Sequence, residues 1–166
     1  MKKVYLIITI ILISSYSCIA QLNKLTRTEY YNIKINDIIF QRIYDTNGDE
    51  TKMKNLFGSD LLYHYENDIL ISKGFWKPGL YSFLFNSDEG NYYVPTSICI
   101  FNSSATVTVK GINVKLGDNK SVFGSLLLNR NTNSIIFIDE ETGTSSLAFK
   151  ISPLTDKIIK IEFNAY

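Results

Sequence analysis

Two stretches of this chain show the same order of local patterns, and this repetition restricts the fold more than any other feature of the sequence. The alternating segments 33–41 and 107–115 align with an offset of 107 − 33 = 74 residues. The segments 57–62 and 123–127, which both open with Phe-Gly-Ser, align with an offset of 123 − 57 = 66. Self-similarity of this kind is the sequence signature of a repeated structural unit.

The offset decreases once more toward the end of the chain. Segment 100–102 aligns with segment 162–164 at an offset of 162 − 100 = 62 residues. A stepwise decrease is expected when the second copy of a duplicated segment has lost residues. We therefore predict two diverged tandem units, the first over about 31–104 and the second over about 105–166.

Each unit is predicted to contain one short helix after its first pair of strands. In segment 49–57, Met53, Leu56 and Phe57 lie on one helical face, acidic residues occupy the first turn and a glycine follows the end. The sequence therefore predicts a helix of about two turns there. The corresponding segment, 118–123, is also followed by a glycine, but it is short enough to form only a 3₁₀ turn.

The other patterned segments alternate and are rich in β-branched residues, which predicts strands. Asn36-Asp37 and Lys110-Gly111 suit tight hairpin turns because Asn, Asp and Gly tolerate positive φ. The predicted fold class is α+β: a mainly antiparallel sheet with two short helices, built from two diverged tandem hairpin-helix-strand units. Later strands are predicted at 80–85, 97–101, 134–138, 147–151 and 158–163.

The order of elements over residues 31–166 resembles the tandem-repeat arrangement of the β-lactamase inhibitor proteins and related small envelope lipoproteins. The resemblance is one of architecture, without a diagnostic motif. This chain departs from that pattern because each unit opens with a hairpin and because it lacks their internal disulfides. The resemblance implies an exported module that binds a protein, although a fold by itself fixes no activity.

Residues 1–20 are typical of a signal peptide. Two lysines precede a ten-residue apolar run, and Cys18 and Ala20 suit cleavage before Gln21. In the alternative, a lipoprotein, Cys18 would carry the lipid. The apolar run is too short to span a bilayer, and no later stretch approaches that length. We expect an exported, periplasmic or extracellular protein with one globular domain over 21–166 and no membrane span in the mature chain.

Charge and cysteine content narrow the class of partner. Seventeen basic and sixteen acidic residues give a formal charge of +1, and loss of the two leader lysines would give 15 − 16 = −1. A nucleic-acid partner is therefore not expected. Cys99 is the one cysteine after the leader, so no internal disulfide is expected in the mature monomer, and its apolar neighbours indicate a core or half-buried thiol.

The aromatic residues are unevenly divided between the two units. Residues 31–104 hold fourteen and residues 105–166 hold five. The breakers in segment 73–79 predict a loop that displays aromatic rings, and such loops are common at binding sites. We predict an aromatic binding surface for a protein or a cell-envelope component, with an inhibitor, immunity or envelope-assembly role. Alternatives are carbohydrate binding and simple packing over the open end of the sheet. The predicted binding residues are Tyr63, Tyr65, Phe75, Trp76, Tyr92 and Tyr93.

The sequence contains no motif that assigns catalysis. His64 is the single histidine, and no metal-ligand spacing, nucleophile elbow or phosphate loop is present. A small hydrolase that uses His64 with Glu66 or Asp68 is a weak alternative. Segment 45–56 begins like a calcium loop but lacks the glycine at its sixth position and the acid at its twelfth. Segment 139–141 is interpreted as a solvated hairpin tip. No catalytic residue, metal or cofactor is predicted.

Overall fold

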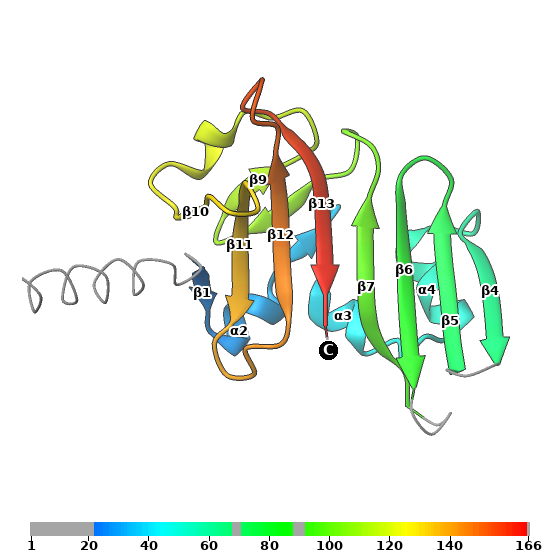
Figure 1. Cartoon of the computed structure of the whole chain (residues 1–166). Helices are drawn as coiled ribbons and strands as arrows, with labels where there is room; N and C mark the ends of the chain where they lie inside the picture. The colour runs from blue at the N-terminus through cyan, green and yellow to red at the C-terminus, as the bar shows by residue number, and fades with distance from the viewer. Residues whose placement is uncertain (1–21, 68–70, 88–91, 166) are drawn as a thin grey trace, which may run out of the picture.

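The computed structural model describes residues 22–67, 71–87 and 92–165, in which strands predominate over helices (Figure 1). The predicted signal peptide therefore lies outside the described residues. The helical elements are α2 (Arg27–Tyr31), α3 (Phe40–Tyr44), α4 (Glu50–Phe57) and the 3₁₀ helix η1 (Lys120–Phe123). The strands are β1 (Asn23–Leu25), β2 (Lys34–Ile35), β3 (Ile38–Ile39), β4 (Leu62–Asn67), β5 (Ile71–Lys77), β6 (Tyr81–Ser87), β7 (Val94–Ile100), β8 (Val107–Val109), β9 (Ile112–Val114), β10 (Leu128–Asn129), β11 (Ser134–Asp139), β12 (Ser146–Ile151) and β13 (Ile158–Asn164).

The larger sheet has the strand order β1-β11-β12-β13-β7-β6-β5-β4, and β10 also pairs with β11. Its neighbouring strands are antiparallel, except that β1 runs parallel to β11. The prediction of a mainly antiparallel sheet is confirmed, and the structure adds one parallel strand. At the centre, β7 pairs with β13, so that Ile98 lies opposite Phe163 and Ile100 opposite Ile161.

The smaller sheet consists of two hairpins in the order β3-β2-β8-β9, joined by antiparallel pairing of β2 with β8. In the first hairpin Asn36 and Asp37 have φ of 47° and 67°. In the second, Lys110 and Gly111 have φ of 50° and 77°. Positive φ at both central positions is the geometry of a two-residue type I′ turn. Both predicted hairpin turns are therefore confirmed.

Both predicted helical segments are also present. The Asp49 side chain accepts a hydrogen bond from the Lys52 backbone N–H at 2.8 Å and caps α4, whose buried residues are Met53 and Phe57. Gly58 ends this helix with φ of 104°, a conformation that favours glycine. Segment 118–123 forms only the short η1, as its length predicts.

The structure contains two further helices, α2 and α3, that the sequence analysis does not predict. The alternating segment 33–41 is strand only as far as Ile39, because α3 begins at Phe40 and buries Phe40 and Ile43. Five residues are too few for a helical periodicity to stand out from β-type alternation. None of the described helices is long and apolar enough to cross a membrane.

The described helices and the smaller sheet lie on one face of the larger sheet, which we call the inner face (Figure 1). Along β6, Tyr81, Phe83 and Phe85 are buried, whereas Leu84 is 39% exposed. Because alternate residues of a strand point to opposite faces, the buried rings face the helices. The opposite, outer face is not covered by any element that the structure describes. The core therefore lies between the larger sheet and the layer on its inner face.

Candidate functional site

The predicted aromatic loop, 73–79, is a strand for most of its length. β5 covers it as far as residue 77, and a turn at 78–80 joins β5 to β6. The loop prediction is wrong because Gly74 is accommodated inside the strand, where cross-strand pairing outweighs its low strand propensity. Phe75 and Trp76 consequently point to opposite faces. Phe75 is fully buried, and Trp76 is 38% exposed on the outer face.

Three of the predicted tyrosines, Tyr63, Tyr65 and Tyr93, gather at the β4 edge of the inner face around Lys73. The Lys73 ammonium lies 3.7 Å from the centroid of the Tyr93 ring. Burial, together with a hydrogen bond to Tyr65, raises the pKa of the Tyr93 hydroxyl. Burial also lowers the pKa of the Lys73 ammonium. This cluster is a packed edge of the core, in which Tyr65 is exposed and Tyr93 is buried.

The sixth predicted residue, Tyr92, is exposed and lies beside Tyr44, with 6.2 Å between the ring centroids. The structure therefore does not bring the six predicted residues together on one surface. Phe75 and Tyr93 belong to the core, and Trp76 stands on the other face of the sheet. A binding role for the exposed members stays a prediction.

Among the residues that the structure describes, none forms a catalytic pair with His64. Its side chain is exposed on β4, opposite Gly74 of β5. The Glu66 side chain and Asp68, its predicted partners, lie outside the described residues. The hydrolase alternative therefore has no geometric support.

The three oxygen ligands of the calcium-like segment are already used within the protein. Asp45 Oδ1 accepts a hydrogen bond from the Gln41 amide at 2.6 Å. Asn47 Oδ1 accepts one from the Tyr93 backbone N–H, and Asp49 caps α4. Among the residues that the structure describes, no three His, Cys, Asp or Glu side chains form a group that could hold a metal ion.

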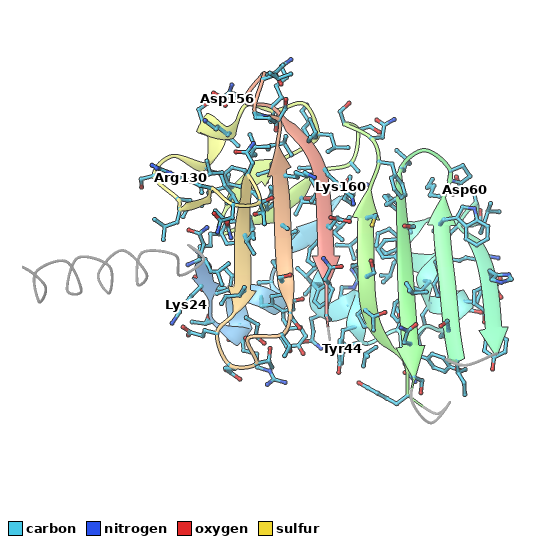
Figure 2. The ribbon with its side chains drawn as sticks, viewed as in Figure 1. Lys24, Tyr44, Asp60, Arg130, Asp156 and Lys160 are labelled. Carbon is cyan, nitrogen blue, oxygen red and sulfur yellow. The ribbon has the colours of Figure 1, made fainter. Side chains whose placement is uncertain are left out.

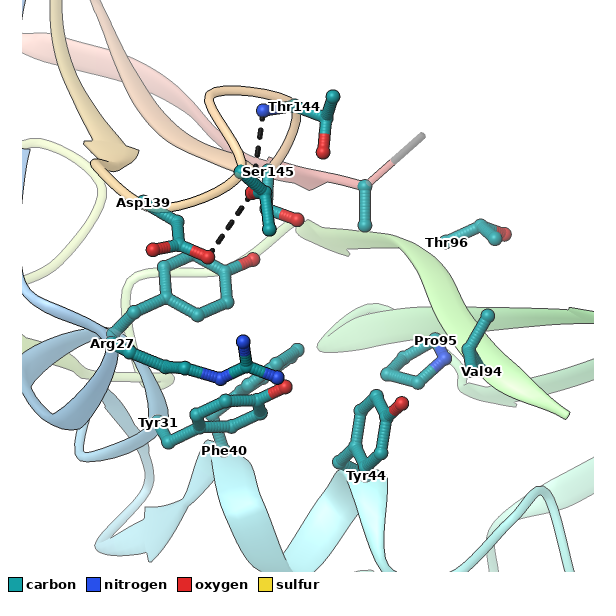
Figure 3. Close-up of a pocket in the computed structure, with 13 residues that line it drawn as sticks. Arg27, Tyr31, Phe40, Tyr44, Val94, Pro95, Thr96, Asp139, Thr144 and Ser145 are labelled. Atoms are coloured by element: carbon teal, nitrogen blue, oxygen red, sulfur yellow. Dashed lines mark hydrogen bonds between the residues drawn. The ribbon is translucent and has the colours of Figure 1, made fainter.

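A pocket of about 250 Å³ opens at the ends of β7 and β13, between these strands and α2 and α3 (Figure 3). Tyr44, which lines it, lies beneath these strand ends in the view of Figure 2. The pocket is lined by four separate chain segments and by the residue after β13. These residues are Arg27, Tyr30, Tyr31, Phe40, Tyr44, Val94, Pro95, Thr96, Asp139, Thr142, Thr144, Ser145 and Ala165.

The helices α2 and α3 supply the aromatic wall of the pocket. The Tyr31 ring stacks on Phe40 at 6.1 Å and meets Tyr44 edge-on at 5.7 Å, between centroids. Tyr30 and Phe40 are buried, whereas Tyr31 and Tyr44 are half-buried. Burial raises the pKa of Tyr30 and that of Tyr44 to about 12. These two phenols therefore remain neutral hydrogen-bonding groups at physiological pH.

Arg27 provides the positive charge of the pocket. Its guanidinium carbon lies 5.7 Å from the centroid of the Tyr31 ring, and one nitrogen donates a hydrogen bond to Glu141 at 3.2 Å. Both side chains of this ion pair are more than half exposed, so the pair contributes little to stability. Because a guanidinium has five N–H donors, Arg27 retains donors for a ligand.

The β11–β12 turn forms the polar wall. Asp139 is only 4% exposed, and its two carboxylate oxygens accept hydrogen bonds from the Glu141 backbone N–H and the Thr142 hydroxyl, both at 3.1 Å. Asp139 thus holds the turn that presents Thr142, Thr144 and Ser145 to the pocket. Glu140 and Glu141 are exposed in this turn, as predicted for a solvated hairpin tip, whereas Asp139 is buried and supports the pocket wall.

The lining residues suit binding. They include no histidine and no cysteine. The Ser145 hydroxyl is hydrogen-bonded to Tyr30, which is not a base at neutral pH, and Asp139 is occupied by the turn. We assign no catalytic residue in this pocket.

One sequence signal for this pocket was available. Thr26 and Glu29 form a capping box: the Thr26 hydroxyl accepts from the Glu29 N–H, and the Glu29 carboxylate accepts from the Thr26 N–H. The pattern Thr-x-x-Glu predicts a helix start. It would have placed Arg27 and Tyr31 one turn apart on the same helical face. The opposite walls, at 94–96 and 139–145, could not be joined to this helix without the topology.

A second exposed feature lies on the outer face. Leu62 pairs with Trp76 across β4 and β5, and Gly74, on the same face as Trp76, pairs with Leu84 of β6. Leu62, Trp76 and Leu84 are 45%, 38% and 39% exposed. They form an apolar patch, which we call the outer patch. On the other half of this face Lys160 of β13 pairs with Glu162 (Figure 2).

Comparison with known proteins gives no match to a family model, to a curated protein or to a solved structure.

Proposed function

We propose that this protein is an exported, non-catalytic binding protein that holds its ligand in the pocket between α2, α3, β7 and the β11–β12 turn. The observation that carries the proposal is the character of the pocket walls. Half-buried tyrosines, one guanidinium and a turn rich in hydroxyl groups surround an apolar floor. Concave, largely apolar sites with a few convergent polar groups are typical of ligand binding.

We also propose that the scaffold arose by duplication. In support, each unit has a hairpin, a short helix that ends in Phe-Gly, and strands of the larger sheet, in the same order. The last strands of the two units, β7 and β13, pair at the sheet centre. In the smaller sheet Lys34 lies opposite Thr108, which is its equivalent at the first offset because 34 + 74 = 108. A two-fold relation between the units would place equivalent residues opposite each other in this way.

Burial revises the last of the three offsets. The predicted value of 62 would make exposed Phe101 equivalent to buried Phe163. Ile98 and Ile100 are buried in β7, as Ile161 and Phe163 are in β13. The matching offset is therefore 161 − 98 = 63.

The pocket lies where the two units differ. The offset falls by 74 − 66 = 8 residues between the hairpin and the end of the short helix. In the structure, α3 occupies this interval in unit one, and no helix lies between β9 and η1 in unit two. The helix α2 precedes unit one, apart from its last residue. The tyrosines of the aromatic wall therefore come from segments outside the shared plan, whereas Phe40 is aligned with Val114 because 40 + 74 = 114.

The binding proposal can be tested by capture from an extract of the producing cells' envelope. The immobilised protein should retain a component that Tyr44→Ala releases and that Phe101→Ala, an exposed aromatic residue outside the pocket, still retains. Circular dichroism checks that each variant is folded. An identical set of retained components for the wild type and Tyr44→Ala would contradict the proposal.

Export has its own test. The N-terminal residue of the protein recovered from outside the cytoplasm should be Gln21. Recovery of a chain that begins with a lipid-modified Cys18 would support the lipoprotein alternative, and a chain that retains the leader in the cytoplasm would contradict export.

The outer patch favours a second candidate function, in which a protein partner docks on the outer face. This candidate matches the resemblance to the β-lactamase inhibitor proteins and the inhibitor, immunity or assembly roles. Its supporting observation is that Trp76, the type of residue that most often dominates protein interfaces, is exposed beside Leu62 and Leu84. In the capture experiment, release by Trp76→Ala but not by Tyr44→Ala would favour this candidate over the pocket.

A further inference from the structure

We propose that the pocket binds a neutral sugar ring, and that an adjoining hollow receives the next ring of an oligosaccharide. This inference rests on the proposed binding function and adds the chemical class of the ligand. The pocket has the size for such a ligand. Its volume of about 250 Å³ accommodates one ring of six atoms with its hydroxyl groups but not a folded segment of a partner protein.

The charges of the side chains that line the pocket cancel. The lining side chains carry one cation, Arg27, and one anion, Asp139, so their formal sum is 1 − 1 = 0. Glu141, which pairs with Arg27, adds a negative charge at the mouth. An anionic ligand would meet these carboxylates, and a cationic ligand would meet Arg27. A neutral ligand avoids both repulsions.

The pocket lining contains both hydrogen-bond donors and acceptors. Arg27 offers only donors, the Thr144 hydroxyl can donate and accept, and the hydroxyls of Thr142 and Ser145, which are bonded to Asp139 and Tyr30, can still accept. A ring that carries several hydroxyl groups can use both kinds at once. Hydrogen bonds to the charged guanidinium are also stronger than those between neutral groups.

Part of the pocket lining is an apolar surface on which the face of a sugar ring could pack. Tyr44 and Arg27 project from α3 and α2 toward the middle of the pocket (Figure 3). Tyr44 is half-buried and keeps its phenol neutral, so it can contact the C–H face of a sugar and still hydrogen-bond at its edge. Pro95 and Val94 lie next to Tyr44 in the view of Figure 3 and add apolar surface to the pocket lining.

An adjoining hollow extends the site. It has a volume of about 650 Å³, is more open, and shares Arg27, Tyr31 and Tyr44 with the pocket. Its other lining residues include Asn32 and Gln41, whose amides both donate and accept hydrogen bonds. The three shared residues thus stand between two spaces, which matches two linked rings better than one isolated ring.

The test titrates the isotope-labelled protein with named sugars and follows backbone amide resonances. The probes are glucose, galactose, mannose and N-acetylglucosamine, together with maltose, cellobiose and N,N′-diacetylchitobiose. At least one should shift resonances of 27–44 and 139–145, and a disaccharide should bind more tightly than its monosaccharide. Tyr44→Ala and Arg27→Ala should each weaken binding by about tenfold, and Phe101→Ala, an exposed aromatic residue outside both spaces, should leave it unchanged.

Charged probes complete the experiment. Glucuronic acid, glucosamine and benzoate should bind more weakly than the best neutral sugar. The inference is overturned if none of the neutral sugars shifts the pocket resonances, or if a charged probe binds more tightly than all of them. Continued Tyr44-dependent capture of an envelope component, with no competition by these sugars, would overturn the sugar class alone and leave the binding function standing.

Discussion

The two units of the proposed duplication use aromatic residues differently. In both, the phenylalanine that ends the short helix packs on the sheet: Phe57 lies 4.6 Å from Phe83, and Phe123 lies 4.8 Å from Phe149, between ring centroids. Unit one buries further rings, among them Phe75 and Phe85, whereas unit two buries more aliphatic residues, among them Ile135, Leu147 and Ile151.

This difference teaches that an aromatic surplus does not by itself mark a binding surface. Most of the surplus in unit one fills the core or the inner-face edge, as the alternative packing interpretation expected. A smaller part, Phe40 and Tyr44, sits on the inserted helix α3 and lines the pocket. If the proposed duplication and the proposed pocket function hold, a segment that interrupts the repeat is a better guide to the site than the number of aromatic rings.

The largest expected effects on stability test whether the cores of the two units are equivalent. Phe83→Ala and Phe149→Ala should each lower the free energy of unfolding by about 3–5 kcal/mol, because each removes a buried ring beside the helix-ending phenylalanine. Urea denaturation measures both values, with Leu84→Ala on the outer face as a control of small effect. Costs that differ by more than about 2 kcal/mol would argue that the two positions are not equivalent.

A second prediction concerns α2, which has no counterpart in unit two. Burial raises the pKa of Tyr30 from 10.0 to about 12. Between these values the unfolded chain has lost the phenol proton and the folded chain has not, so stability falls as the pH rises. The stabilisation is complete below pH 10 and should decrease by about 2 kcal/mol near pH 12.

Denaturation at a series of alkaline pH values measures this loss. Tyr30→Phe, which cannot ionise, should make the dependence of stability on pH shallower. The same steep decline in the variant and the wild type would show that Tyr30 is not its source.

The smallest effects compare the two helix caps. Asp49→Ala should cost about 1 kcal/mol, because the Lys52 N–H at the start of α4 loses its acceptor. Asn119→Ala, which removes the acceptor of the Ser121 N–H, should cost about half as much because η1 is a single short turn. Thermal denaturation of both variants tests the order, and a larger loss from Asn119→Ala would reverse the comparison.

The predicted elements succeeded where local chemistry decides the structure. Positive φ at Asn36, Asp37 and Gly111, and the helix predicted over 49–57, follow from residue type and hold in the structure. The prediction of a loop at 73–79 is wrong. Its glycines and proline indicate a break in the strand, but pairing with β4 and β6 keeps most of the segment in the sheet. Pairing with neighbouring strands therefore outweighs the propensity of single residues in a sheet.

The pocket shows the same limit more strongly. Its walls come from segments 27–44, 94–96 and 139–145, and nothing in one segment announces the others. The capping box at Thr26 was readable, but five-residue helices such as α2 and α3 gain their stability from burial against the sheet and not from intrinsic propensity. Such elements become visible only with the tertiary structure.

The parallel strand β1 has a consequence for the order of folding. Lys24 lies beside Ile138, so 138 − 24 = 114 residues must be synthesised after β1 before its partner exists. Asn23 then fastens the contact through hydrogen bonds with Leu127 and with the Ile136 carbonyl. Closing so large a loop is slow compared with forming local hairpins. We therefore expect β1, the first strand to be synthesised, to be among the last to pair. It then adds to the β11 edge of a sheet whose other strands can already have assembled.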